Sequence, residues 1–363
     1  MVAAVTGVML AAAVVGNALI HRRFSAERLA GALERLLEGR SHGLYHIRVG
    51  GTRLNPFSRS YSISDIFVEV DSARLAGLRE AGERPKAVYG FRIPSISVDG
   101  IGLWGAARGR FRLGEVTIDA PEIDILVDQR GRRNPADSVR KLPHEELRTL
   151  PWPLSIRKLR INGGRIGYAE LARDGARPGE FEFGDLYLTV SNIDNAPVPA
   201  NPIMTATVDM ALGGKIRLGA DITYDQSQSG LTMSFKGGMG GGSARVFNSI
   251  LMDLEGFKIE SGQVDTAWFD VDVKDDLAKG KLVAVYRDLD LDKIDKVTRG
   301  QSLGDKLASF IASNFKIKSA NPDGHHGEPP RVASIYLRRN RQTPLIQYLW
   351  YTVRQGLATT IGM

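Results

Sequence analysis

Apolar side chains recur along the middle of this chain with one unusual spacing. Residues 154–170 read LSIRKLRINGGRIGYAE. The apolar side chains of the stretch that matter here are Ile156, Leu159, Ile161, Ile166 and Tyr168. Their offsets of 0, 3, 5, 10 and 12 do not follow the helical period of 3.6 residues, and they follow the strand period of two only in part. The first three offsets recur in copies that start at Ile63, Ile93, Leu113, Phe183 and Leu254.

Copies that start at Leu113, Ile156 and Leu254 also carry the second half of the pattern. The residues between the halves are Asp-Ala-Pro, Asn-Gly-Gly and Glu-Ser-Gly, which favour turns. The repeated unit is therefore predicted to be a strand, a tight break and a second strand.

Offsets 3 and 5 lie on one face of a strand, whereas offset 0 has the opposite parity. A bulge between offsets 0 and 3 would bring all three side chains to one face and would bend the strand. Repeated bends predict a curved sheet with one apolar and one polar face. Arg157, Lys158, Arg160 and Arg165 are expected mostly on the polar face.

The period of two extends from Tyr45 to about Leu291 and includes about sixteen candidate strands. Glycine is frequent, with 40 of 363 residues, which fits many turns and bulges. Helical patterns are few and fall at 72–82, 134–150, 244–254, 303–315 and 343–357. The predicted fold is mainly β: a long, curved antiparallel sheet with one apolar face, an N-terminal membrane helix and a few capping helices. Sixteen strands in one row would span roughly 75 Å.

The first twenty residues, MVAAVTGVMLAAAVVGNALI, contain no ionisable side chain. Their length just suffices to cross the hydrocarbon core of a bilayer. We interpret residues 1–23 as a transmembrane signal anchor; a cleaved signal peptide and a buried Ala-rich helix are the alternatives. His21, Arg22 and Arg23 follow the segment, and the positive-inside rule taken alone would place the body in the cytoplasm.

Two amphipathic helices flank the β-rich region. Residues 25–39 carry a Leu-rich face and either plug one end of the sheet or lie beside the membrane. In the C-terminal helix the predicted apolar face consists of Leu345, Ile346, Leu349, Trp350, Val353 and Leu357. This helix either caps the last strands or contacts a membrane interface, where Tyr, Trp and Arg are favoured. The side chains predicted at that interface are Tyr348, Trp350, Tyr351 and Arg354.

No pattern in the sequence supports catalysis or a metal site. The chain has no cysteine, the aspartates at 288–295 lack the EF-hand glycine and glutamate, and His144-Glu145-Glu146 lacks the second histidine of a zinc protease. The net charge of +7 is mild and its charges alternate in sign, which argues against a nucleic-acid partner. We expect no enzymatic activity and no cofactor.

The stretches YHIRV, LSIRKLRINGGRIGY, FNSILMDLEGFKIESGQVD, GKLVAVYRDLDL and TPLIQYLWYTVRQGL, with the apolar N-terminal segment, resemble the AsmA-like proteins of the bacterial envelope. These proteins form a branch of the bridge-like lipid-transfer group. The resemblance implies a single-pass inner-membrane protein whose body, residues 24–342, is a β-groove in the periplasm and is followed by the C-terminal helix, residues 343–363. It implies lipid as the ligand, with phospholipid as its class, and envelope proteins as possible partners.

Parity along the strands selects the side chains that would line the groove. They are Ile66, Val68, Val116, Ile118, Leu159, Ile161, Ile166, Leu186, Leu188, Phe257 and Ile259. A one-layer sheet must bury its apolar face on something, and acyl chains are one such occupant. Three functions remain open at this stage: lipid binding or transfer, a non-catalytic assembly or scaffold role with the groove filled by side chains or a partner, and an enzyme with an unrecognised site.

Overall fold

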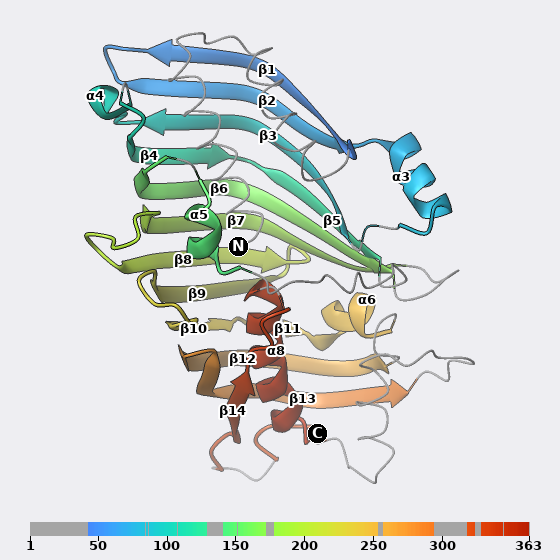
Figure 1. Cartoon of the computed structure of the whole chain (residues 1–363). Helices are drawn as coiled ribbons and strands as arrows, with labels where there is room; N and C mark the ends of the chain where they lie inside the picture. The colour runs from blue at the N-terminus through green and yellow to red at the C-terminus, as the bar shows by residue number, and fades with distance from the viewer. Residues whose placement is uncertain are drawn as a thin grey trace.

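A computed structural model of the 363-residue chain shows one large curved sheet with short helices beside it (Figure 1). The structure describes residues 43–83, 85, 87–106, 108–128, 141–150, 152–171, 178–252, 257–293, 318–323, 328–343 and 345–362. The predicted anchor at 1–23 and the predicted helices at 25–39 and 303–315 lie outside these residues. Among the described helices, none combines the length and the apolar character needed to cross a bilayer.

Within the described residues, fourteen strands form the sheet. The first seven are β1 (Tyr45–Asn55), β2 (Ser60–Val70), β3 (Ala87–Asp99), β4 (Phe111–Asp119), β5 (Glu122–Asp128), β6 (Leu154–Leu171) and β7 (Gly179–Asp194). The others are β8 (Ile203–Leu212), β9 (Ile216–Asp225), β10 (Met233–Met239), β11 (Gly242–Ser243), β12 (Phe257–Lys274), β13 (Leu277–Lys293) and β14 (Val332–Arg338). The mainly β prediction is confirmed.

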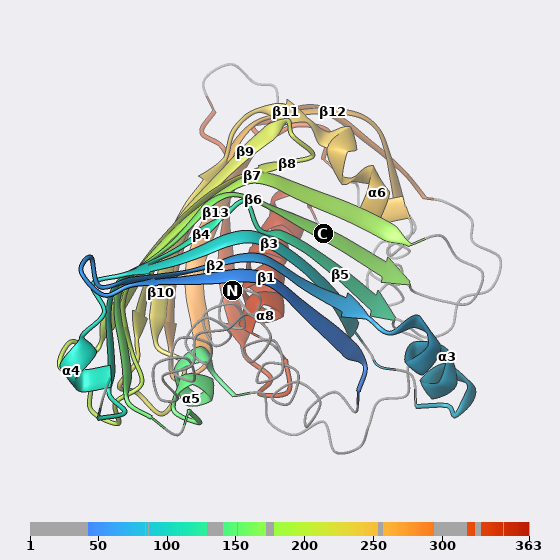
Figure 2. The same cartoon turned by 90° about the horizontal axis from the view of Figure 1, so that it is seen from above.

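Helical segments in the described residues are short except at the C-terminus. They are α3 (Ser72–Glu80), α4 (Leu103–Ala106), α5 (Pro143–Leu147), the 3-10 turn η1 (Ala244–Phe247), α6 (Asn248–Ile250) and α8 (Leu345–Thr360). The helices expected within 72–82, 134–150, 244–254 and 343–357 are thus present where the structure describes them. Figure 2 shows α5 and α8 on the inner side of the curved sheet.

The sheet is mixed, so the prediction of a purely antiparallel sheet is wrong at one place. Its path runs β1-β2-β3-β4-β6-β7-β8-β9-β10-β12-β13-β14, with β5 between β3 and β6 and β11 beside β12. All pairings are antiparallel except that β6 runs parallel to both β4 and β5. The first residue of β4, Phe111, is paired with the first residue of β6, Leu154. The connection after β5 therefore brings the chain back to the level at which β4 starts. Twelve strands lie on the path, so a row across it spans roughly 50 Å rather than 75 Å.

The predicted break inside the repeated unit is not a turn between two strands. Residues 154–171 form the single strand β6, and Asn162-Gly163-Gly164 is an irregularity within it. Residues 257–274 likewise form the single strand β12 across Glu260-Ser261-Gly262. In the copy that starts at Leu113, Ala120 and Pro121 interrupt the strand and separate β4 from β5. Both β4 and β5 pair with β3 on one side and with β6 on the other. The second half of the unit is therefore the far end of the same strand.

The predicted bulge between offsets 0 and 3 is found in the copy that starts at Phe183, where the pairing of β7 with β8 shifts register between Gly184 and Tyr187. The copy that starts at Ile63 keeps its register with both neighbouring strands, and a left-handed residue interrupts the pairing there. Asp65 (φ 54°) lies between Ile63 and Ile66, and Asp185 (φ 48°) precedes Leu186. At Asp65 and Asp185 the left-handed backbone rotates the strand. The apolar side chains before and after each of these residues therefore point to the same face of the sheet. Asp and Asn enter the left-handed region more readily than other residues with a side chain, which explains why they occupy these sites.

Irregular backbone positions are aligned across neighbouring strands. They are Gly50, Asp65, Pro94, Ala120, Gly163 and Asp185, one on each of the lines formed by β1, β2, β3, β4–β5, β6 and β7. The Ala120 amide donates to the carbonyl of Asn162 at 2.7 Å, which ties the two middle members together. Figure 2 shows these strands bending partway along their length. We attribute the curvature of the first half of the sheet to this line.

Candidate functional site

The concave face of the sheet carries two unbroken apolar rows that run from β1 to β14, perpendicular to the strands. The first row is Leu54, Tyr61, Val98, Val116, Leu159, Val190, Ala206, Ile222, Phe235, Val271, Gly280 and Ile335. The second row is Thr52, Ile63, Ile96, Ile118, Ile161, Leu188, Val208, Ala220, Gly237, Phe269, Leu282 and Ala333. Apart from Thr52 and the Tyr61 hydroxyl, no side chain in these inner rows is polar. Each row joins twelve strands through consecutive registered pairs.

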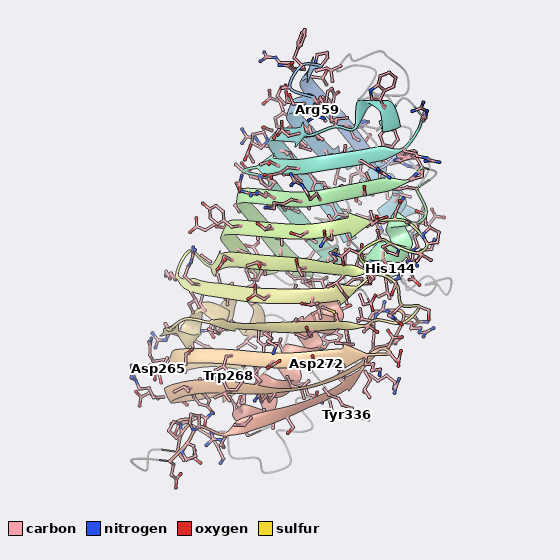
Figure 3. All side chains as sticks on the ribbon, turned by 90° about the vertical axis from the view of Figure 1, so that its left-hand side faces the viewer. Arg59, His144, Asp265, Trp268, Asp272 and Tyr336 are labelled. Atoms are coloured by element: carbon pink, nitrogen blue, oxygen red, sulfur yellow. The ribbon has the colours of Figure 1, made fainter. Side chains whose placement is uncertain are left out.

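The convex face carries a polar row between the two inner rows. Its members are Arg53, Ser62, Ser97, Thr117, Arg160, Thr189, Thr207, Asp221, Lys236, Asp270, Lys281 and Ser334. Neighbours within this outer row interact: Lys236 forms an ion pair with Asp270 at 3.1 Å. Lys281 lies over the ring of Trp268, which Figure 3 shows on the same convex face. The sheet is thus strictly two-sided across its full width.

Exposure of the inner rows changes along the sheet. In the first half, Val98, Val116 and Leu159 are fully buried at 0% exposure. In the middle, Leu188, Val208, Ile222 and Phe269 are only partly buried. At the β14 end, Leu282 and Ile335 are again 1–2% exposed. On the middle strands β7–β12 the accessible apolar side chains are therefore Ile222 and those of the second row, because Val190, Ala206, Phe235 and Val271 of the first row are at most 8% exposed.

Most of the predicted lining residues lie on this concave face. Val116 and Leu159 belong to the first inner row, and Ile118, Ile161 and Leu188 to the second. Ile66, Val68 and Leu186 lie beyond the bend line and are buried in the same hydrophobic core as the inner rows, and Ile166 packs against that core. Ile259 is buried outside that core, and its backbone is bonded in both directions to the side-chain amide of Asn248 in α6. The side chain of Phe257 lies outside the described part of the structure.

Of the four basic side chains of β6 that were predicted to face outward, Arg157, Arg160 and Arg165 do so, and Lys158 is half-buried. Arg157 is exposed. Arg160 forms an ion pair with Glu115 at 3.0 Å, and Arg165 forms one with Asp124 at 2.8 Å. Such surface pairs contribute at most about 1 kcal/mol, so they orient the side chains more than they stabilise the sheet.

Helix α8 covers the β13–β14 end of the inner rows. A Cβ atom on Gly356 would lie 2.8 Å from Leu282 Cβ and 3.3 Å from Ile335 Cδ1, so only glycine allows this approach. Tyr348 is 2% exposed, and its hydroxyl donates to the Leu337 carbonyl at 2.9 Å. Burial raises the pKa of Tyr348 to about 12. The alternative in which the C-terminal helix caps the last strands is therefore the one observed.

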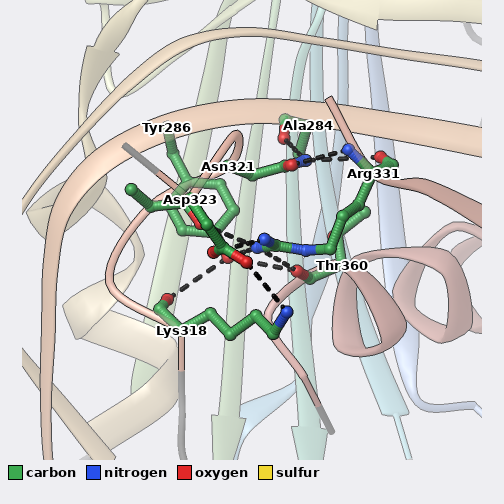
Figure 4. A network of polar contacts seen from close by, with 8 residues as sticks. Ala284, Tyr286, Lys318, Asn321, Asp323, Arg331 and Thr360 are labelled. Atoms are coloured by element: carbon green, nitrogen blue, oxygen red, sulfur yellow. Dashed lines mark hydrogen bonds and ion pairs between the residues drawn. The ribbon is translucent and has the colours of Figure 1, made fainter. Parts of the chain in front are cut away.

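Polar groups fix both the side and the end of α8. The side-chain amide of Gln355 bonds both backbone groups of Tyr336, accepting from its N–H at 3.1 Å and donating to its carbonyl at 3.2 Å. This contact occupies part of the free edge of β14. At the C-terminal end, Arg331 and the Tyr286 hydroxyl both donate to the Thr360 carbonyl, at 3.2 and 3.1 Å (Figure 4). A cation at a helix C-terminus is electrostatically favourable.

The buried anchor of this network is Asn321, which is 0% exposed. Its amide donates to the Ala284 carbonyl at 2.5 Å and accepts from the Arg331 N–H at 2.7 Å (Figure 4). Residues 318–323 are thereby attached to the edge of β13. The sequence did not predict this role, because a single Asn in a stretch rich in Gly and Pro is typical of a loop.

A buried ion pair closes the strand ends beside α8. Asp276, in the β12–β13 turn, contacts Arg339 at 3.3 Å and Arg341 at 3.1 Å. The side chains of Asp276 and Arg339 are only 8% and 3% exposed. The Arg339 N–H also donates to the Asp276 carbonyl. Sequence reasoning did not identify this pair, because 63 residues separate its members.

Helix α5 packs at the same end of the strands, against β9. His144 Nδ1 lies 2.6 Å from the Tyr224 hydroxyl, and His144 is 2% exposed. Burial, and then the nearby Arg148 guanidinium, lower the pKa of His144 below 6.5, so the imidazole is neutral at pH 7. Glu145 accepts from the Leu142 N–H and caps the helix. The His-Glu-Glu stretch therefore serves packing and capping.

The predicted membrane-interface residues separate into two groups. Tyr348 packs into the core, whereas Trp350 is 44% exposed and Tyr351 and Arg354 are partly exposed. The predicted apolar face of α8 is wrong at Ile346 and Trp350, which point away from the sheet while Tyr348, Thr352 and Gly356 face it. The helix turns a face of small and hydroxyl-bearing residues inward because β13 approaches closely. An interfacial role stays a prediction for Trp350, Tyr351 and Arg354.

Among the described residues, no group of three or more His, Asp or Glu side chains could hold a metal ion. The aspartates of the 288–292 stretch line β13, where Asp288 occupies a bulge with φ 53°. No family model matches the chain. No curated protein matches it either.

Proposed function

We propose that this chain binds lipid acyl chains along the apolar concave face, which acts as a groove between β1 and α8. The single observation that carries the proposal is the pair of unbroken inner rows, which join twelve strands without a polar side chain beyond Thr52 and Tyr61. At roughly 50 Å they exceed the ~30 Å thickness of a bilayer core. A surface with no polar group to orient a substrate is suited to acyl chains.

The energetics support lipid as an occupant. Each methylene removed from water contributes about 0.8 kcal/mol. Ten buried methylenes would give about 8 kcal/mol before the costs of association, which is enough for useful binding without a headgroup site. The half-buried side chains of the middle strands, such as Leu188 and Ile222, are the positions where a chain would lie. Phospholipid is the ligand class that we propose.

The proposed setting follows from the resemblance to AsmA-like proteins. Residues 1–23 anchor the chain in the inner membrane, and the β-groove faces the periplasm, where it binds or transfers phospholipid during envelope biogenesis. The two-sided curved sheet is compatible with this setting. A fusion of a phosphatase that is active only in the periplasm, placed after the C-terminus, reports the topology directly.

A second function is favoured by one specific observation. Val98, Val116 and Leu159 are fully buried, so a ligand could not reach these three side chains in this conformation. A non-catalytic assembly or scaffold protein would show such a filled face, with its own side chains or a partner in the groove. Lipid occupancy decides between the two functions.

Neighbouring residues on β7 supply the test. Leu188 is half-buried on the concave face, and Thr189 lies on the convex face beside Arg160. Leu188→Asp places a carboxylate where an acyl chain would lie, and an unpaired charge in an apolar site is costly. Thr189→Asp adds the same charge on the outside and faces a cation.

Phospholipid that co-purifies with each full-length variant is measured per protein, with circular dichroism to confirm folding. We expect Leu188→Asp to lose most of its lipid and Thr189→Asp to retain the wild-type amount. Equal lipid in folded Leu188→Asp and wild type contradicts groove binding. Absence of lipid from the wild-type protein in mild detergent favours the assembly function.

A further inference from the structure

One corner of the sheet presents two bulky side chains to solvent. Phe57, in the β1–β2 turn, is 100% exposed, and Trp104, in α4, is 82% exposed. No other large apolar side chain of the described residues approaches these values except Val198 at 85%. Large aromatic side chains exposed to this degree need an explanation, because burial elsewhere would gain about 2–3 kcal/mol for each.

The two tips belong to one corner and are held in place. The Ile101 N–H donates to the Arg59 carbonyl at 3.0 Å, which joins the β1–β2 turn to the segment that leads into α4. The side chain of Asn55 accepts from the Phe57 N–H at 3.0 Å and shapes its turn. Figure 1 shows α4 next to the β1–β2 turn, and Figure 3 shows Arg59 at the same extremity.

The base of α4 is equally well fixed. The amide of Arg110 donates to the Gly105 carbonyl at 2.9 Å, and a Cβ on Gly105 would lie 2.9 Å from the Arg110 carbonyl oxygen. The helix therefore folds tightly onto the start of β4. Both aromatic side chains extend from ordered backbone turns that do not need to rearrange.

Exposed basic side chains lie on the same two segments as these tips. The segments 53–60 and 99–112 contain five arginines and one carboxylate, Asp99. The arginines are Arg53, Arg59, Arg108, Arg110 and Arg112, and all five are exposed. Within the described part of the chain, none of them has an ion-pair partner, in contrast to the exposed Arg48, which pairs with Glu69 at 2.8 Å.

We infer that this corner docks on the surface of an anionic bilayer, with Phe57 and Trp104 inserted at the headgroup level and the arginines on the lipid phosphates. Aromatic side chains favour that depth, and each basic residue near an anionic surface adds attraction. Apolar insertion and a basic patch together make the two signals that stable peripheral binding requires. An acidic protein partner would need the charge but would not require two apolar tips.

Docking at this corner is independent of what fills the concave face. It would bring the β1 end of the inner rows, at Leu54, next to the bilayer. The further step, that lipid passes between the bilayer and this end, rests on the proposed function. Docking can therefore hold while lipid binding fails, and the two are tested separately.

Site-specific fluorescence tests the inference in the full-length chain. The protein has no cysteine, so Phe57→Cys or Trp104→Cys carries a single environment-sensitive fluorophore. Lys215→Cys is the control, because Lys215 is exposed in the β8–β9 turn at the opposite end of the strands. Each protein is reconstituted with phosphatidylcholine containing 30% phosphatidylglycerol, or with phosphatidylcholine alone, and headgroup-level nitroxide lipid serves as quencher.

We expect quenching at positions 57 and 104 in the anionic membrane, weaker quenching without phosphatidylglycerol, and none at 215. Changing Arg59, Arg108 and Arg110 to Gln should weaken the docking equilibrium by roughly 100-fold. The control variant of equal charge changes Arg48, Arg217 and Arg287 to Gln and should retain docking, because these arginines pair with carboxylates elsewhere. Positions 57 and 104 as weakly quenched as 215 would overturn the inference and would point to a protein partner. Equal loss in both arginine variants would also overturn it, since the corner would then have no special role.

Discussion

Replacement of Gly356 by Ala tests the contact that closes the sheet at β14. Two effects oppose each other. Alanine favours a helix interior over glycine by about 1 kcal/mol. The new Cβ would lie 2.8 Å from Leu282 Cβ and 3.1 Å from Leu282 Cδ1, and a Cβ cannot move by changing rotamer. Overpacking of this kind costs about 1–3 kcal/mol, so we expect net destabilisation of about 0–2 kcal/mol and local loosening of α8.

The same substitution at Gly77 is the matched control. Gly77 lies inside α3, and a Cβ there would meet nothing within 4 Å. Gly77→Ala should therefore stabilise its helix by about 0.5–1 kcal/mol. Denaturant unfolding gives the overall change, and hydrogen exchange followed by mass spectrometry gives the protection of α8. If Gly356→Ala stabilises the protein as Gly77→Ala does and leaves α8 fully protected, the close packing of α8 on Leu282 is refuted.

Further predictions concern the polar anchors. Because burial lowers the pKa of His144, the unfolded chain takes up a proton that the folded chain resists; the contribution of His144 is complete above pH 6.5 and falls as the pH drops below it. The wild-type melting temperature should thus fall more between pH 7.5 and 5.5 than that of His144→Phe, and identical pH profiles would contradict this. Asp276→Ala leaves the Arg339 guanidinium buried without its carboxylate and should cost about 3–5 kcal/mol in urea unfolding; a loss below about 1 kcal/mol would mean that the pair is solvated. Asn321→Ala removes the partners of the Ala284 carbonyl and the Arg331 N–H and should cost about 2–4 kcal/mol, with lost exchange protection at the end of α8; unchanged protection would separate Asn321 from that helix.

The sequence pattern was sufficient to predict the two-sided sheet and its bends. Offsets 0, 3 and 5 predicted a bulge, which the structure contains at Asp185, whereas at Asp65 a left-handed residue interrupts the pairing without a shift of register. Asn162-Gly163-Gly164 led to the wrong prediction of a turn, because residue types that end a strand can also produce an irregularity within a continuous strand. Only the neighbouring strands decide which occurs, and they are distant in sequence.

The contacts that close the concave face were harder to predict. The parallel pairing of β6 depends on where the connection after β5 returns, which no local pattern records. The face of α8 that packs on the sheet carries Thr352 and Gly356, so a prediction based on apolar side chains alone assigns the wrong face of the helix to the core. The contact between His144 and Tyr224 joins residues 80 positions apart. Each of these features is a long-range choice made by packing.

The most direct test of lipid binding is to map where an acyl chain lies. A phospholipid with a photoactivatable diazirine in its acyl chain is added to the full-length protein, irradiated and located by peptide mass spectrometry. We expect adducts on alternate residues of the middle strands, at Leu188, Val208 and Ile222, with none at the intervening Thr189 and Thr207. Adducts spread equally over both faces, or confined to the convex face, would contradict a lipid-binding groove.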